Sequence, residues 1–543
     1  MGAVLLVDDN TDQLELRSRI LTAAGHRVRA AACAAEAIDA LAREAPKLVI
    51  MDLRLPTTED GLALIRQIKP SYPDTRLVVL SGWPGDLDAA PERELVDEIL
   101  PKPVRSKYLV EMVSKFAILL LCLCLAGIAP ARGADNNAHP FQLDALAEVV
   151  AEVELSVPGA DWGRQGREAV LAIVTTDDAA KHHIMTFAGA DRYKYRVFLG
   201  ELAPGAHKVQ IDKHPDYSAR GLQMQVHGVT FRQYKPGDAE YAVIANAPAL
   251  YARPNTIGKF TDLPLLTYCE KLGDGSLRYS VIFSNEDGGT STRALMARWG
   301  RVTDIEHVYQ VWPDPSGKPQ RAQIQSPGHK DIDFLGKREG LHPLLGVTTD
   351  NNMVEGNSTS AVRYQLAPVL VDLGFASREK VMDENPILYA IAARELEREG
   401  KLRKFDTVEG TKISAPENYL ILEMRIANKN ARIAVMARLE GENFFRTSHV
   451  GITDMAIERS GWVRTTVELP PATQPTQVAE LAWICLPEPK TSEAPGSCRV
   501  DGVGKLFFLN ARQQPDASFW RPRIGDRFPH PLTTGQVRMV PLR

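Results

Sequence analysis

The sequence predicts two fold classes in one chain: an α/β region with a doubly wound parallel sheet at residues 1–115, and a β-rich region at residues 135–543. In the first region, short apolar runs alternate with stretches of helical periodicity, which is typical of βαβ units. In the second, short alternating runs are separated by turn dipeptides such as Pro-Gly, which indicate β-sandwich or jelly-roll-like modules. An uncharged apolar run separates the two regions.

The composition excludes several classes of protein. A length of 543 residues predicts about three to five domains. With 64 basic and 68 acidic side chains the formal net charge is −4, so the chain is not a globally basic nucleic-acid binder. The mean hydropathy of −0.19 excludes a polytopic membrane protein. Six cysteines in so long a chain exclude a disulfide-dense scaffold.

The elements of the first region are expected to alternate along the chain. Strands are expected at residues 3–7, 26–32, 47–51, 76–80 and 98–100, most of which are short apolar runs followed by polar residues. Helices are expected at residues 11–24, 34–45, 61–68, 92–96 and 106–115. Continuous apolar strands are buried on both faces, so helices should cover both sides of a parallel sheet.

Polar side chains follow the carboxyl ends of these predicted strands: Asp8, Asp9, Asp52, Ser81 and Lys102. In a doubly wound sheet this edge is the ligand crevice. Three carboxylates brought together there would repel one another, and Mg²⁺ relieves such repulsion while also binding phosphate oxygens. A carboxylate can then act as a nucleophile toward a phosphoryl group, with a lysine neutralising the transferring oxygens.

Four motifs carry a family resemblance: VLLVDDN at residues 4–10, VIMDLRLP at 49–56, VVLSG at 78–82 and LPKP at 100–103. On these motifs residues 1–115 resemble the receiver domain of two-component response regulators. The resemblance implies a flavodoxin-like (βα)5 fold and a phosphorelay function, with a sensor histidine kinase or a phosphotransfer protein as partner. Such a domain promotes only its own aspartyl phosphorylation.

The resemblance also implies a role for each motif residue. Asp52 matches the phosphoacceptor. Asp8 and Asp9 match the acidic pair that holds Mg²⁺ together with Asp52, and Arg54 matches the position whose backbone carbonyl completes the metal site.

Two further residues match active positions, and one position departs from the family. Ser81 matches the Ser/Thr switch and Lys102 matches the active-site lysine. The family's Lys-Pro step implies a cis peptide bond before Pro103. Three residues before the lysine the family usually has Tyr or Phe, and this chain has Ile99. That departure puts aromatic signalling to the outer face in doubt, but not phosphorylation.

The apolar run from Phe116 to Ala131 resembles the core of a secretory signal peptide within residues 112–134. It is too short for a comfortable transmembrane helix, it follows Met112 and a lysine, and it ends in the cleavage pattern Ala129-Pro-Ala131. Three interpretations compete: an internal signal-anchor with membrane contact, two genes joined in one reading frame with the second starting near Met112, and a buried helix joining two soluble domains.

The second region is expected to contain a β-rich domain at residues 135–375, a helical connection at 376–410 and a second β-rich domain at 411–543. One helix is expected at residues 386–399, stopped by Gly400. Strands are expected at residues 149–157, 193–199, 208–211, 222–231, 241–244, 278–284, 308–311, 419–426, 431–439, 465–469, 478–485 and 505–509.

No family resemblance and no catalytic motif stands out in residues 135–543. Neither a Walker loop, HExxH, GxSxG nor a helix-turn-helix pattern is present, so we expect no sequence-specific DNA binding. Whether this region is an enzyme stays open. Cys485 and Cys498 could form a disulfide if the region is exported.

Three polar clusters in the second region are candidate cation sites. His182-His183 near Asp177 and Asp178 could bind a metal, although a helix surface is the preferred interpretation. The run at residues 285–290 could bind a cation or a sugar, although a polar β-turn is the preferred interpretation. The run at 329–333, followed by acidic and amide side chains at 350–355, could bind Ca²⁺, but the EF-hand spacing is absent and a solvated loop is the preferred interpretation.

Two functions therefore compete. In the first, the chain is a phosphorelay response regulator that accepts a phosphoryl group on Asp52 in the cytoplasm, fused to an export-type β-rich region. In the second, residues 135–543 are a secreted or periplasmic hydrolase or carbohydrate-binding protein, and the receiver-like region is joined to it by accident. The second region is then periplasmic, membrane-anchored or secreted.

Overall fold

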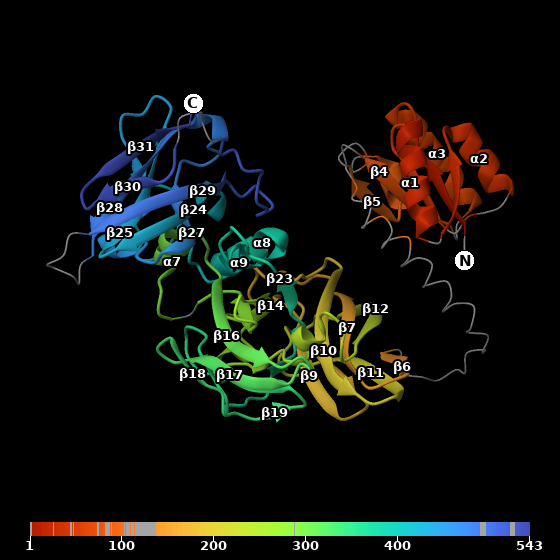
Figure 1. Cartoon of the computed structure of the whole chain (residues 1–543), viewed down its shortest axis with the longest axis horizontal. Coiled ribbons are helices and arrows are strands. Elements are labelled where there is room, and N and C mark those ends of the chain that lie inside the picture. The colour runs from red at the N-terminus through yellow and green to blue at the C-terminus, as the bar shows by residue number, and fades with distance from the viewer. Residues whose placement is uncertain are drawn as a thin grey trace. The chain divides into compact units, whose positions relative to one another are not determined.

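The computed structural model describes residues 3–24, 26–43, 46, 48–72, 75–81, 87, 90–102, 104, 109, 113, 137–286, 288–488, 496–521 and 527–542. The chain divides into two compact units, Met1–Gly133 and Ala134–Arg543, each described by itself below (Figure 1).

The first unit is a five-stranded parallel sheet in the order β2-β1-β3-β4-β5, with helices between the strands (Figure 1). Side chains of the central strands alternate between two cores, since Leu5 and Val7 belong to one and Val4 and Leu6 to the other. The doubly wound α/β fold expected for this region is thus confirmed. The elements are β1 Ala3–Val7, α1 Thr11–Ala23, β2 Arg27–Ala31, α2 Ala34–Arg43, β3 Leu48–Asp52, α3 Thr58–Ser71, β4 Arg76–Ser81, η1 Pro91–Leu95 and β5 Glu98–Pro101.

Local sequence explains where these helices begin. The Asn10 side chain accepts a hydrogen bond from the backbone N–H of Gln13 and so caps α1. Thr57 and Asp60 form a capping box at α3, which therefore begins earlier than the expected residue 61. Of the helix expected at 106–115, only Leu109 and Val113 lie among the described residues, and both are helical and buried.

The second unit begins with three sheets, as the alternating sequence pattern predicts. Their orders are β10-β7-β12, β19-β20-β13-β22-β9-β8-β11-β6 with β21 beside β20, and β18-β17-β16-β15-β14-β23. The strands are β6 Ala138–Leu143, β7 Ala147–Ser156, β8 Leu171–Thr176, β9 Ala180–Met185, β10 Tyr193–Leu202, β11 Gly205–Lys213, β12 Gln225–Tyr234, β13 Ala249–Tyr251, β14 Pro264–Lys271, β15 Leu277–Phe283, β16 Asp304–Pro313, β17 Pro319–Ser326, β18 Lys330–Asp333, β19 Arg338–Glu339, β20 His342–Val347, β21 Val354–Glu355, β22 Arg363–Tyr364 and β23 Val369–Val371.

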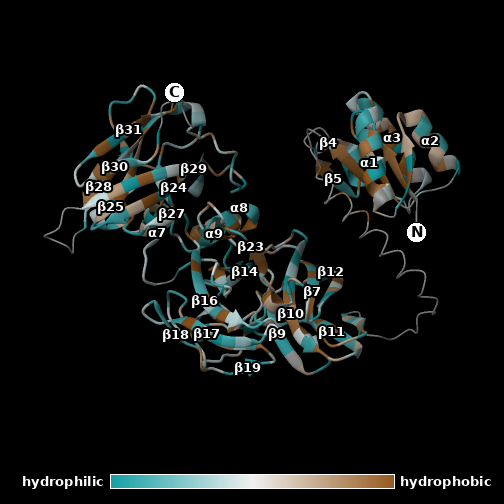
Figure 2. Ribbon diagram, in the orientation of Figure 1, coloured by the Kyte–Doolittle hydropathy of each residue, from teal (hydrophilic) through white to brown (hydrophobic). Residues whose placement is uncertain are grey.

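The end of the chain is a β-sandwich of two four-stranded sheets, β27-β24-β29-β30 and β26-β25-β28-β31. One core joins them, since Leu422 of β24 and Trp483 of β28 belong to the same buried cluster. Apolar residues are interspersed with polar ones along these strands (Figure 2). The strands are β24 Tyr419–Lys429, β25 Ala431–Leu439, β26 Arg446–Thr447, β27 Gly461–Glu468, β28 Val478–Pro487, β29 Ser497–Phe507, β30 His530–Thr533 and β31 Val537–Pro541.

Cys485 and Cys498 form a disulfide, as the sequence suggested. Cys485 lies on β28 and Cys498 on β29, so the bond links the two sheets of the sandwich. Among the described cysteines, Cys33 and Cys269 carry free thiols.

Helices lie between the first three sheets and the sandwich: α7 Thr292–Trp299, α8 Lys380–Glu384 and α9 Ile387–Arg398. The buried Glu395 of α9 accepts hydrogen bonds from the Trp162 indole at 2.9 Å and the Ser284 hydroxyl at 3.0 Å. The helix expected at 386–399 is therefore present, and its buried carboxylate binds residues of the loops that connect the preceding strands.

One expected strand is wrong. Residues 241–244 form the short helix α6, Tyr241–Ala245, because a brief apolar run fits a buried helix as well as a strand. Four of its five residues are buried, and the Tyr279 hydroxyl donates to the carbonyl of Val243 at 2.8 Å. Tertiary packing buries this segment on several sides, and it therefore forms a helix and not a strand.

Within the described ranges, no helix is both long and apolar enough to cross a membrane. The run from Phe116 to Ala131 and the expected cis bond before Pro103 lie outside the described residues.

Candidate functional site

The parallel ladder of the first unit brings three carboxylates together. Val7 of β1 lies opposite Met51 of β3, so the residues that follow, Asp8 and Asp52, meet at the carboxyl edge with Asp9 beside them. A carboxylate oxygen of each lies within 4.8 Å of the others. Among the described residues this is the one group of three or more acidic, histidine or cysteine side chains close enough to share a metal ion.

Lys102 neutralises part of this negative charge. Its Nζ lies 2.6 Å from Oδ2 of Asp52 and 3.6 Å from Oδ2 of Asp8. The Lys102 backbone N–H donates to the carbonyl of Ser81 at 2.8 Å, which ties the end of β5 to the end of β4. The loop therefore delivers a cation to the carboxylate of Asp52.

Arg17 is a site residue that the sequence analysis missed. Its guanidinium forms an ion pair with Oδ2 of Asp8, and both side chains are largely buried. A signal was present in the sequence, since Arg17 lies at helical spacing between the buried Leu14 and Leu21 of α1. An arginine on the buried face of a helix beside an acidic edge indicates an ion pair there.

Backbone groups orient the two inner carboxylates. The N–H of Asn10 donates to Oδ1 of Asp8 at 3.0 Å, and the N–H of Arg54 donates to Oδ1 of Asp52 at 3.3 Å. Arg54 thus lies in the loop that follows Asp52, and this loop folds back so that its backbone contacts the Asp52 carboxylate.

The two remaining positions singled out by the sequence also lie in this unit. Ser81 is buried as the last residue of β4, which ends at the same edge of the sheet as Asp52. Ile99 is partly buried against the core. The structure therefore places every residue of the predicted site at or beside one sheet edge.

Residues 4–114 match the family model of the response regulator receiver domain. This part of the chain is a response regulator receiver domain. It is 33% identical over 116 residues to the DNA-binding transcriptional regulator NtrC of Escherichia coli K12, and 34% identical over 117 residues to the response regulator protein FleR of Pseudomonas aeruginosa. Each alignment spans 21% of this chain and 24% of the relative, so the chain covers about a quarter of these proteins.

Solved structures of receiver domains are also similar to this chain. The receiver domain of NtrX from Brucella abortus is 31% identical, with a TM-score of 0.20, and the alignment covers 21% of this chain and 96% of that one. NtrC and FleR are matched through the receiver domain only. Our expectation that this chain makes no sequence-specific DNA contact therefore stays a prediction.

The second unit does not assemble the cation site considered at His182-His183. Both histidines lie on strand β9, not on a helix surface as expected, and both are buried. Burial lowers the pKa of His182 to about 3 and that of His183 to about 4. The nearby carboxylates are engaged elsewhere: Asp177 pairs with His207 at 2.7 Å, and Asp178 with Lys208 at 2.7 Å.

The polar runs at residues 285–290 and 329–333 have protein partners. Glu286 accepts from the backbone N–H of Thr290 at 2.7 Å, as in a polar turn, and Asp331 pairs with His307 at 2.9 Å.

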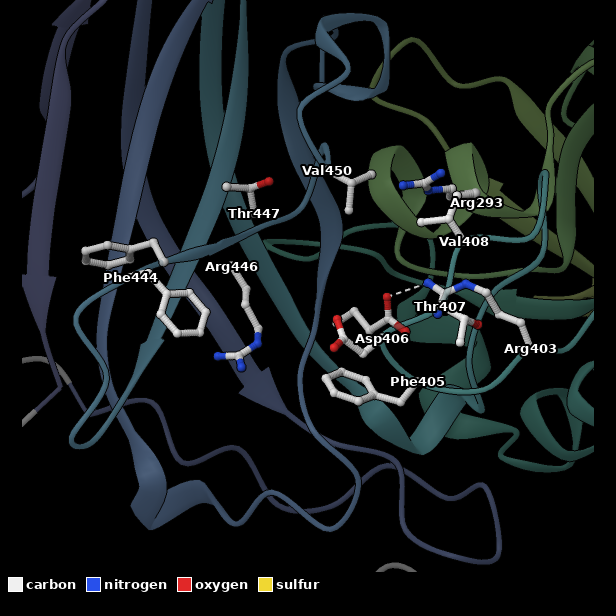
Figure 3. Close-up of a pocket in the computed structure, with 12 residues that line it drawn as sticks. Arg293, Arg403, Phe405, Asp406, Thr407, Val408, Phe444, Arg446, Thr447 and Val450 are labelled. Atoms are coloured by element: carbon white, nitrogen blue, oxygen red, sulfur yellow. Dashed lines mark hydrogen bonds and ion pairs between the residues drawn. The ribbon is translucent and has the colours of Figure 1, made fainter.

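An open cleft of about 400 Å³ lies beside α7, between the segments at residues 403–408 and 444–450 (Figure 3). Its rim carries exposed apolar side chains, with Phe444 51% and Val408 79% exposed. Two of its arginines already have acidic partners: Arg403 pairs with Glu468 at 2.6 Å, and Arg446 pairs with Glu442. The cleft is therefore largely balanced in charge.

Proposed function

We propose that the receiver domain accepts a phosphoryl group on Asp52 from a sensor histidine kinase or a phosphotransfer protein. The observation that carries this proposal is the contact of 2.6 Å between Lys102 Nζ and Asp52 Oδ2 inside the acidic cluster. A carboxylate oxygen of Asp52 forms a P–O bond while the donor's P–N bond breaks, and the donor's imidazole nitrogen keeps the bonding electron pair. Labelling by a small phosphodonor, compared with Asp52→Asn, tests the proposal.

Lys102 and Ser81 are assigned the next events. Transfer adds negative phosphoryl oxygens beside Asp52, and the flexible Lys102 ammonium can follow them as a point charge. The Ser81 hydroxyl, buried at the end of β4, is assigned the hydrogen bond to a phosphoryl oxygen. Ser81 would then draw its loop toward Asp52 and transmit the change without an aromatic partner at Ile99.

The acidic cluster fits a resident Mg²⁺. Its oxygens within 4.8 Å of one another match a hard cation with oxygen ligands at about 2.1 Å. Asp8, Asp9, Asp52 and the Arg54 carbonyl are the proposed ligands. Bound there, Mg²⁺ supplies charge neutralisation of the phosphoryl oxygens.

Binding of the metal has a consequence for one carboxylate oxygen. Arg17 and Lys102 both contact Oδ2 of Asp8, so that oxygen must be shared or released when the metal binds.

We predict that Mg²⁺ raises the melting temperature of the receiver domain, residues 1–115. A ligand at a hundredfold excess over its dissociation constant stabilises the folded state by about 2.7 kcal/mol. Asp9→Ala should abolish this rise, and should raise the melting temperature without metal because it removes a repelling charge. Differential scanning calorimetry measures both effects. Asp39→Ala on the exposed face of α2 is the matched control and should keep the full rise. An equal rise in Asp9→Ala would place the metal elsewhere.

We also propose that residues 112–543, when they start at Met112, are exported and processed near Ala131, whereas the receiver acts in the cytoplasm. Two observations support this. Residues 112–134 have the features of a signal peptide. The sandwich carries a disulfide between Cys485 and Cys498, and such bonds persist mainly in oxidising compartments.

A reporter enzyme fused after Asp135 tests this proposal in a bacterium. We predict periplasmic activity when translation starts at Met112, because the apolar run then lies at the amino terminus where the export machinery reads it. The mature amino terminus should lie near Arg132. A companion fusion that starts at Met1 is the control. Purely cytoplasmic activity from both starts would contradict the proposal and favour a buried helix.

A further inference from the structure

Three arginines face one cleft in the second unit without a directly bonded acidic partner among the described residues. The cleft has a volume of about 460 Å³ and lies between strands β14–β16, the segment that precedes α8, and the residues that lead into β27. Its lining includes Arg278, Arg378, Arg459, Trp299 and Trp462. A volume of this size is within the range of small-molecule sites.

The hydrogen bonds of these arginines go to neutral groups. Nε and Nη2 of Arg278 both donate to the side-chain oxygen of Gln310 at 3.2 Å. Nη1 of Arg459 donates to the carbonyl of Arg298 at 2.6 Å. The Arg378 side chain makes no hydrogen bond or ion pair with any residue in the described part of the chain, and its backbone carbonyl accepts from the N–H of Val381 at 3.3 Å. Within the part of the chain that the structure describes, none of the three positive charges is therefore offset by a direct ion pair.

The acidic groups of the lining do not balance this charge. Glu379 is buried and pairs with Arg301, a fourth arginine, at 3.1 Å. Glu270 is the remaining carboxylate of the lining. Burial raises its pKa more than the positive charges of Arg278 and Arg378 lower it. The cleft is left with an excess of guanidinium groups.

Arg378 keeps its charge although it is partly buried. Burial alone lowers the pKa of Arg378, but the carboxylates of Glu379 and Glu306 act against this from beyond bonding distance and raise that pKa. These carboxylates make the cation stable without occupying its donors. The Arg378 guanidinium is thus charged and has N–H groups free for a ligand from outside the chain.

Two of the arginines converge on one indole. The Arg459 guanidinium lies 3.6 Å from the Trp299 ring centroid, and that of Arg378 lies 4.7 Å from the same centroid. Burial lowers the pKa of Arg459 to about 9. The charges of Arg378 and Arg301 lower this pKa further, whereas the carboxylate of Glu379 raises it. The charge of Arg378 thus repels that of Arg459, and an oxyanion that contacts both would reduce the repulsion while accepting charge-assisted hydrogen bonds.

We propose that this cleft binds a small organic oxyanion, with its carboxylate, sulfate or phosphate group between Arg378 and Arg459 and its body against Trp462. The Arg378 fork supplies two parallel donors to such a group. This site lies in the second unit and does not depend on the phosphorelay function of the receiver. It also differs from the cleft of Figure 3, where Arg403 and Arg446 are paired.

Fluorescence and calorimetric titrations of the full chain test the proposal in Mg²⁺-free buffer at constant ionic strength. The probes are glucuronate, sulfate and inorganic phosphate. Trp299 and Trp462 line the cleft, so occupancy should change tryptophan emission saturably. Tightest binding of glucuronate would assign the site to a carboxylate ligand, and tightest binding of phosphate or sulfate to a phosphorylated or sulfated one.

Substitutions locate the site. Arg378→Gln should weaken binding of the preferred probe roughly tenfold or more, the worth of a charge-assisted hydrogen bond. Arg378→Lys keeps the charge but not the fork and should give an intermediate loss. Arg499→Gln, which removes an exposed arginine paired with Asp501 at 2.6 Å, is the matched control and should leave affinity unchanged.

Clear outcomes would overturn the proposal. One is the absence of saturable binding of all three probes at millimolar concentration. The other is equal affinity in Arg378→Gln and Arg499→Gln. Because the Arg378 side chain makes no hydrogen bond with a described residue, its substitution leaves no described group without its donor. If Arg378→Gln nevertheless fails to fold, as judged by near-UV circular dichroism, Arg459→Gln replaces it with the same expected loss.

Discussion

Replacing Asp52 with asparagine is expected to abolish phosphorylation of this chain. In the wild-type protein a small phosphodonor such as acetyl phosphate, with Mg²⁺, should label the receiver domain. The Asp52→Asn substitution keeps the size of the side chain but removes the nucleophilic carboxylate oxygen, so no acyl phosphate can form. Labelling with a radioactive donor, followed by gel electrophoresis of the full chain, measures the loss.

Two controls make the labelling result decisive. Asp39→Asn, on the exposed face of α2, removes an aspartate away from the carboxyl edge and should keep full labelling. The wild-type label should also be released by hydroxylamine, which cleaves acyl phosphates. Equal labelling of Asp52→Asn and wild type, or a label that resists hydroxylamine, would overturn the assignment of Asp52.

Replacing Arg464 with alanine is expected to destabilise the second unit by about 3–5 kcal/mol, because it leaves the buried Glu423 carboxylate without its cation and Asp383 with Lys505 alone. Arg464 is fully buried on β27. Its Nε donates to Glu423 at 2.9 Å, and its Nη1 donates to Asp383 and to the Tyr389 hydroxyl, both at 2.9 Å. Urea unfolding of the full chain, followed by tryptophan emission, measures the change.

Arg499→Ala is the matched control for this stability prediction. It removes an arginine whose side chain is 52% exposed, and exposed ion pairs contribute less than about 1 kcal/mol. If Arg464→Ala lowers the free energy of unfolding no more than Arg499→Ala does, the buried ion-pair network does not stabilise the second unit.

The Arg464 effect should also depend on pH. Burial alone raises the pKa of Asp383, but Arg464 and Lys505 outweigh it and hold that pKa below its ordinary value of 3.8. A carboxyl with a lowered folded-state pKa adds stability above its unfolded pKa, and this stability is lost as the pH falls through the folded value. The difference in the free energy of unfolding between wild type and Arg464→Ala should therefore become smaller as the pH falls. If this difference in the free energy of unfolding stays constant across the acid range, the role of Asp383 is contradicted.

Local sequence determined the receiver domain almost completely. Its strands are apolar runs buried on both faces, and parallel strands place their carboxyl ends at one edge. Residues far apart in the chain, such as Asp8 and Asp52, could therefore be predicted to meet. The helix at Ile387–Arg398 and many strands of the second unit were also predictable, since periodicity depends on neighbours along the chain. The pairing of Cys485 with Cys498 was anticipated as one option.

Only the tertiary structure decided which faces of those elements meet. The helix at Tyr241–Ala245, the buried strand that carries His182 and His183, and the ion pair of Arg17 with Asp8 each depend on what packs around them. The second unit shows this most clearly, because strand β9 pairs in parallel with β22, which is far along the chain.

The arginine cleft depends on the same kind of long-range placement. Arg278 lies on β15, whereas Arg378 and Arg459 lie in separate loops, and nothing near any of them in the sequence indicates the other two. Hydrophobic periodicity states that an element has a buried face, but it carries no information on its partner. The partner is chosen by shape and burial summed over the whole core, and for the second unit that choice created both the cleft and the network around Arg464.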